Sequence, residues 1–123
     1  MADLRIKFIK VLKVELEDLL EDFNVAERKH AQRFARHEIT DYVFRQNEGL
    51  FRMEEDSVRH ILRGLGEFDP TRHEDLNQVV SAVDTLVRHL VKDYEEPEAM
   101  VGFVGRKLQK VRRYVESCDE TLS

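Results

Sequence analysis

The most regular hydrophobic pattern in the chain runs from residue 76 to residue 94. Apolar side chains recur there at steps of three and four, which places them on one side of an α-helix. Flanking apolar residues widen that side, so we expect a helix buried in a bundle. Burying the six apolar side chains that form this stripe is worth roughly 9–18 kcal/mol, whereas ordering about 20 residues costs roughly 30 kcal/mol. Other segments must therefore pack around this helix. The stripe consists of Leu76, Val80, Val83, Val87, Leu90 and Tyr94, flanked by Val79, Leu86 and Val91.

Two helices are expected in the first third of the chain. The first runs from Ala2 to Phe23, with Asp3 as its N-cap. Asn24, with Glu27 three positions later, has the spacing of a capping box and would open a second helix over 25–46. The apolar stripe of this second helix is thin, which indicates a position at the periphery or in an oligomer contact.

Residues 47–49, Asn-Glu-Gly, form only a weak break, because one glycine costs about 1 kcal/mol in a helix. Two interpretations remain open: a turn near 47–49, or one bent helix from 25 to about 65. The long helix would span about 60 Å, and no other segment could match it within one compact domain. It would therefore favour an intertwined dimer.

The second half of the chain contains further helix signals. A helix is expected over 54–65, and Thr71–Glu74 has the spacing of a capping box that would open the helix described first. Pro97 suits the first turn of a last helix, and residues 119–123 carry no pattern and should fray. We expect residues 1–123 to form one all-α domain, a four- or five-helix bundle that is mostly up-down antiparallel.

Composition supports long, solvated helices. The chain is 41% hydrophobic and 37% charged, with only two prolines and five glycines. Its single cysteine, Cys118, cannot form an internal disulfide, which favours a reducing compartment, and we expect the cytoplasm. No stretch approaches the ~20 apolar residues of a membrane span, so no membrane partner is expected. A net charge of −5 disfavours nucleic acid as a partner.

One pair of residues has a spacing used by metal sites. Glu27 and His30 lie three apart, as in ferritin-like di-metal bundles, where such a pair points inward and ligates one ion. The chain contains one copy, so a homodimer would have to supply the second. The paired histidine motifs of hemerythrin-like bundles are absent: His60 is followed at four by Gly64, and no two histidines stand four apart.

Two basic blocks, residues 28–37 and 106–113, alternate with acidic ones, which indicates complementary faces within the bundle or between subunits. No nucleophile–base pair, phosphate loop or cysteine cluster is present, so we expect no enzyme activity and no cofactor. The preferred hypothesis is a helical bundle that binds protein, either itself as a homo-oligomer or another protein. The alternatives are a dimeric ferritin-like or hemerythrin-like bundle that binds iron or manganese through Glu27 and His30, and a protein that binds RNA or another polyanion.

Overall fold

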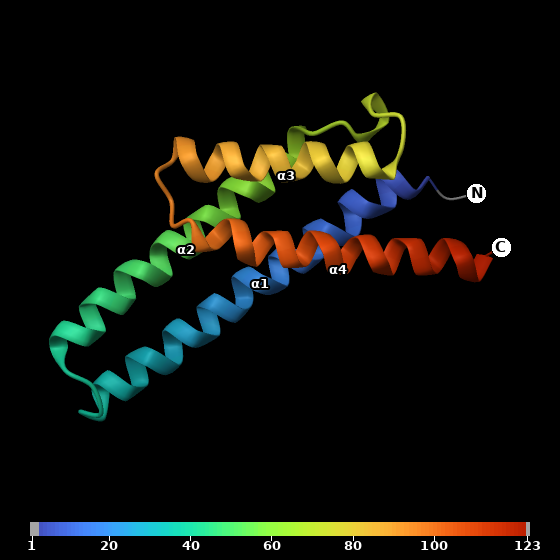
Figure 1. Cartoon of the computed structure of the whole chain (residues 1–123). Coiled ribbons are helices and arrows are strands. Elements are labelled where there is room, and N and C mark those ends of the chain that lie inside the picture. The colour runs from blue at the N-terminus through green and yellow to red at the C-terminus, as the bar shows by residue number, and fades with distance from the viewer. Residues whose placement is uncertain (1–2, 123) are drawn as a thin grey trace.

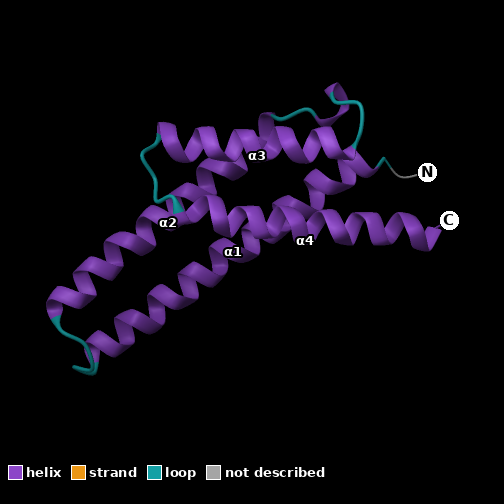
Figure 2. Ribbon diagram, viewed as in Figure 1, coloured by secondary structure: helices purple, strands orange, loops and turns teal. Residues whose placement is uncertain are grey.

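A computed structural model describes residues 3–122, and the side chains of residues 118–122 lie outside its described part. The described residues contain helices and no strand, which confirms the expected all-α bundle. Figure 2 shows how little of the chain lies in loops. The elements are α1 (Leu4–Ala35), α2 (Asp41–Glu67), a 3-10 turn η1 (Pro70–Arg72), α3 (Leu76–Asp93) and α4 (Ala99–Leu122).

Consecutive helices run in opposite directions, and they do not overlap along their full lengths. α1 and α2 form a long hairpin, and α3 and α4 pack against only one half of it (Figure 1). The two ends of the chain lie at the covered end of the hairpin. The molecule therefore consists of a four-helix body and a two-helix extension.

The body is held by a core to which every helix contributes. The stripe on α3 is buried as expected from Val79 to Val91, and Leu76 and Leu90 pack at its edge. Tyr94 is the exception, because it is 51% exposed and its ring stacks on His60 at 3.8 Å. The core residues are Phe8, Ile9, Leu12 and Leu16 of α1; Val58, Ile61 and Leu65 of α2; Val79, Val80, Val83, Val87 and Val91 of α3; and Met100, Val104, Leu108, Val111 and Val115 of α4.

The first predicted helix boundary is wrong. Asn24 is not a cap but lies inside α1, which continues to Ala35. Asparagine costs only about 0.7 kcal/mol or less in a helix interior, and the inward side of α1 continues beyond it through His30, which is buried. The break falls instead at residues 36–40, where His37 has a φ of 61° and the Thr40 side chain accepts a hydrogen bond from the backbone N–H of Val43.

The interpretation of one long helix from 25 to about 65 is correct at residues 47–49, where the helix is unbroken, and wrong at its start. α2 continues through Gly49 without a break, but it begins at Asp41 rather than Val25. Its 27 residues span about 40 Å, not 60 Å. The very long helix that would have favoured an intertwined dimer is therefore absent.

The cap of α3 also differs from expectation. Asp75, rather than Thr71, is the N-cap, and its side chain accepts a hydrogen bond of 2.9 Å from the backbone N–H of Gln78. Thr71 instead donates its hydroxyl to Asp69, the cap of η1. Arg5 of α1 holds this loop to the body, because its guanidinium donates to the backbone carbonyl of His73 at 2.6 Å.

α2 and α3 approach each other closely at Gly64. A Cβ at this position would lie 3.1 Å from Leu90 and 3.5 Å from Leu86, so the side chain of Leu90 would have to shift by a few tenths of an ångström to admit a larger residue. Gly49, earlier in the same helix, has nothing within 4 Å of such a Cβ. The two glycines therefore have different roles, although both lie inside α2.

Gly49→Ala should raise the free energy of unfolding by about 0.5–1 kcal/mol, because alanine loses less backbone freedom in a helix. Gly64→Ala gains the same propensity but presses its methyl group onto Leu90, so it should be less stable than Gly49→Ala. Urea denaturation followed by circular dichroism measures both. Equal stabilisation by the two substitutions would contradict the close approach at Gly64.

Candidate interaction surface

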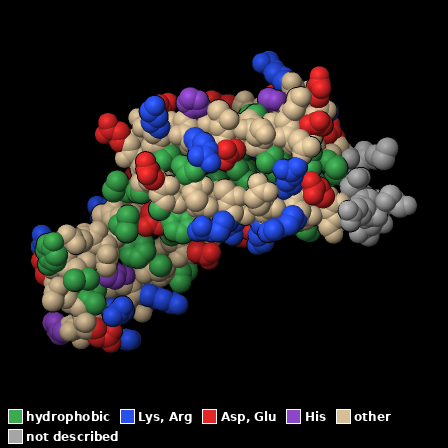
Figure 3. All heavy atoms as spheres, viewed as in Figure 1, with side chains coloured by type: hydrophobic (Ala, Val, Ile, Leu, Met, Phe, Trp, Pro, Cys, Tyr) green, Lys and Arg blue, Asp and Glu red, His purple; other side chains and the backbone are tan. Residues whose placement is uncertain are grey.

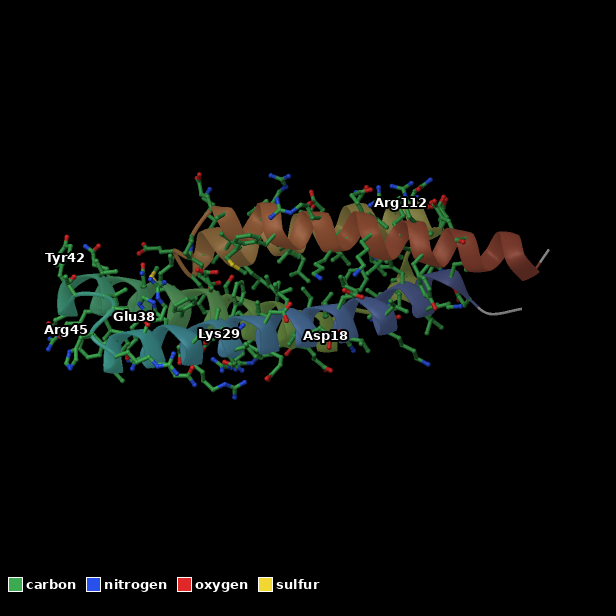
Figure 4. The ribbon with its side chains drawn as sticks, turned by 90° about the horizontal axis from the view of Figure 1, so that it is seen from below. Asp18, Lys29, Glu38, Tyr42, Arg45 and Arg112 are labelled. Atoms are coloured by element: carbon green, nitrogen blue, oxygen red, sulfur yellow. The ribbon has the colours of Figure 1, made fainter. Side chains whose placement is uncertain are left out.

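The end of the α1–α2 hairpin extends beyond the body. We call residues 24–53 the hairpin tip. No member of the hydrophobic core, nor any apolar residue packed against it, falls between Phe23 and Val58 among the described residues. Figure 1 shows the tip standing clear of α3 and α4. Figure 4 shows Glu38, Tyr42 and Arg45 gathered at its end.

A small aromatic cluster holds the two helices of the tip together. Phe34 of α1 and Phe44 of α2 stack with ring centroids 4.3 Å apart. His30 stacks on Phe44 at 5.5 Å and meets Phe51 edge-on at 5.7 Å. His30 is only 9% exposed. The sequence analysis missed this cluster, although Phe44 and Phe51 stand seven apart and so share one side of a helix.

One side of α2 is covered in the body and uncovered in the tip. Steps of seven lead back from Gly64 through Ser57 to Leu50 and Val43, and such steps stay on one side of a helix. Gly64 contacts α3, and Ser57 is fully buried. Leu50 is 47% exposed and Val43 40% exposed. Figure 3 shows hydrophobic side chains at the surface of this part of the molecule.

The opposite side of α2 is charged and internally neutralised. Arg45 lies 3.0 Å from Asp41, and Arg52 lies 2.5 Å from Glu48. These residues are spaced by three and four, so they form one stripe that faces away from Leu50. The tip segment of α2 is therefore an amphipathic helix with a solvated charged side and an apolar side that no part of the described chain covers. We call Val43, Leu50 and Met53, which is 46% exposed, the apolar face of the tip.

The predicted metal residues lie where the tip joins the body, and the structure brings a third residue to them. Glu55, on α2, lies close enough to Glu27 for the Glu27 carboxyl group to raise the pKa of Glu55. Glu27 Oε2, His30 Nε2 and Glu55 Oε1 are all buried, with no hydrogen-bond partner among the described residues. Glu55 was not predicted as part of this cluster, because it lies within the acidic run 54–56 and nothing in that run distinguishes a buried carboxylate from a solvated one.

This cluster does not amount to a metal site within one chain. Among the side chains that the structure describes, no three from His, Cys, Asp and Glu converge as a bound ion would require. Binding of iron or manganese by Glu27 and His30 stays a prediction, and it needs ligands from a second chain. Cys118, the only cysteine, lies outside the described side chains.

About half of the lysines and arginines in the two basic blocks are paired with acidic residues. In the first, Arg28 lies 3.2 Å from Glu21 and Arg33 lies 3.5 Å from Glu38. In the second, on α4, Lys107 and Lys110 each lie 3.2 Å from Glu15, and Arg112 contacts Glu116 and Asn77. These contacts agree with complementary charges within the bundle, and binding of RNA or another polyanion stays a prediction. None of the described helices has an apolar stretch sufficient to cross a membrane.

No family model, curated protein or solved structure matches the chain. The function proposed below therefore depends on the surface geometry alone.

Burial raises the pKa of Glu55, and the adjacent Glu27 carboxyl raises it further, while Arg59 Nη2 at 3.9 Å only partly opposes this. Folding thus favours the protonated form of Glu55, which the unfolded chain loses near pH 4.5. The free energy of unfolding should fall as the pH rises from about 4.5 to the raised pKa, and then level off. Glu55→Gln removes this loss, so the variant should be more stable than the parent at pH 7 by about 1 kcal/mol or more.

Urea denaturation of the parent and of Glu55→Gln across a range of pH measures both free energies of unfolding, and the difference between them should vanish below pH 4. Glu21→Gln, on the exposed pair with Arg28, is the matched control and should change little. A Glu55→Gln variant no more stable than the parent at pH 7 would contradict the account of a buried carboxyl pair.

Proposed function

We propose that this protein acts by protein–protein association, and that it forms a homodimer through the apolar face of the hairpin tip. The observation that supports the proposal is the continuity of one side of α2. Where α3 covers it, that side is core, and where α3 ends, Leu50 and Val43 remain exposed. Exposed apolar residues in line on one helix are typical of an interaction surface.

A second copy of the chain fits this face because each copy leaves the same apolar face of α2 exposed. Two tips paired about a two-fold axis would place the apolar face of one α2 against that of the other, and four helices would then surround one small core. The charged stripe through Arg45 and Arg52 would stay in water, since it lies on the other side of α2 and its charges are already paired. The charge pairs of this stripe would not need to be buried, which removes one cost of such a contact.

The size of the tip bounds the strength of the association. About 12 residues of each helix extend beyond the body, which corresponds to about 18 Å of length at 1.5 Å per residue. Two helices side by side are about 20 Å wide, so each copy offers a footprint of roughly 400 Å². Stable complexes bury about 800 Å² of accessible surface per partner, so we expect a dimer that dissociates at micromolar concentrations.

Sedimentation equilibrium from about 1 to 300 μM should show the average mass rising from that of the monomer toward that of the dimer. Val43→Asp should weaken the association at least tenfold, because it places a carboxylate in the apolar contact. Arg45→Gln, two residues away on the charged side, changes the net charge by the same amount and should leave the association unchanged. A strictly monomeric parent protein, or equal effects of the two variants, would contradict the proposal.

Metal binding is separable from this function by elemental analysis of the purified protein. An association driven by the apolar face requires no metal, and chelation with EDTA should leave the dimer intact. Iron or manganese at stoichiometric amounts, lost from Glu27→Ala together with the dimer, would instead favour the ferritin-like alternative.

A further inference from the structure

A second surface feature lies in the four-helix body, far from the hairpin tip. α1 and α4 lie side by side and enclose a groove of about 410 Å³ between them (Figure 4). Its apolar lining comes from Val11, Val14, Val111 and Tyr114. Val14 and Tyr114 are each more than half exposed, at 55% and 53%, so the groove is open to solvent. Volumes of about 300–1,000 Å³ with mostly apolar walls are typical of small-ligand sites.

Lysines outnumber acidic residues at this groove. Lys10 and Lys110 line it, and the ammonium group of Lys7 lies 5.9 Å from the centre of the Tyr114 ring. Figure 3 shows lysine and arginine side chains gathered along the lower edge of α4. The groove is therefore locally positive in a chain whose net charge is −5.

The single acid in the groove is already neutralised. Glu15 lies 3.2 Å from both Lys107 and Lys110. Although partial burial alone would raise its pKa, hydrogen bonds from the two lysines hold the pKa of Glu15 below its ordinary value. Glu15 therefore stays ionised and forms ion pairs with these two lysines. Lys10 has no ion-pair partner within the described part of the chain and remains available to an incoming anion.

The length of the groove sets the class of ligand. The lining residues span six positions on α1, 10–15, and five on α4, 110–114, which is less than two helical turns. A docked partner helix uses anchors spread over two turns or more. A short molecule with an apolar body and an anionic end matches both the length and the charge.

We propose that this groove binds a small amphiphilic carboxylate, with its hydrocarbon part against Val11, Val14 and Val111 and its carboxylate beside Lys10 and Lys110. The aromatic face of Tyr114 closes one end of the apolar surface. This site is independent of the hairpin tip, since it is formed by the opposite half of α1 and by α4. It goes beyond the association proposed above.

Decanoate is the probe for this site, because it combines a flexible apolar chain with one carboxylate. Titration into the isotope-labelled full chain should shift the amide resonances around residues 10–15 and 110–114, with saturation near millimolar concentration. Decanol, which keeps the chain and lacks the charge, should bind several-fold more weakly. The double variant Lys10→Ala, Lys110→Ala should weaken decanoate binding about tenfold, since each exposed charge contact is modest by itself.

Val14→Asp supplies the sharper control, because it adds a carboxylate at an exposed position of the groove. It should abolish decanoate binding and leave self-association unchanged. Val43→Asp, on the tip, should do the reverse, so that failure of either proposal is recognised separately. Resonance shifts spread over the whole chain, no shift at about 5 mM decanoate, or an unaffected Val14→Asp variant would each overturn the proposed site.

Discussion

The unequal reach of the helices is the constraint on which the rest of this structure depends. α1 has 32 residues and α2 has 27, whereas α3, which packs more against α2 than against α1, has 18. At 1.5 Å per residue, α3 ends about 20 Å short of the length of α1. The valines of α3 and the apolar residues of α4 bury one half of the hairpin and leave the other without cover. The fold thus creates an interaction surface through the length of its elements alone.

The two helices of the tip are held together by their own aromatic contacts. Because those contacts use only the side of α2 that faces α1, another side of α2 stays apolar and exposed. Phe44 and Phe51 meet α1, whereas Leu50 and Val43 face the space that α3 occupies in the body. At the junction of tip and body lie the carboxyl groups of Glu27 and Glu55, each with one buried oxygen that lacks a hydrogen-bond partner among the described residues. Buried polar groups of this kind cost stability, so the junction is the least well satisfied part of the hairpin.

The sequence was sufficient for the fold class and for α3, because the buried valines repeat with the helical period from Val79 to Val91, over about three turns. It was insufficient at Asn24, where a good capping residue sits inside a helix whose tertiary contacts outweigh a small local preference. It was also insufficient for Glu55, whose position beside Glu27 depends on the register of two antiparallel helices. Such register is set by the loop at residues 36–40, which the capping pattern had not located. The exposure of Leu50 and Val43 follows from where α3 ends in space, which no periodicity reveals.

The most direct test of this account is an isotope-filtered NOE experiment on a mixture of labelled and unlabelled chains at high concentration. It reports only contacts between copies. The account predicts intermolecular NOEs that involve the methyl groups of Val43, Leu50 and Met53, and none that involve Val79 or Val87 in the body. Absence of intermolecular NOEs at the tip, or their appearance only at other surfaces such as the groove beside Val14, would contradict it.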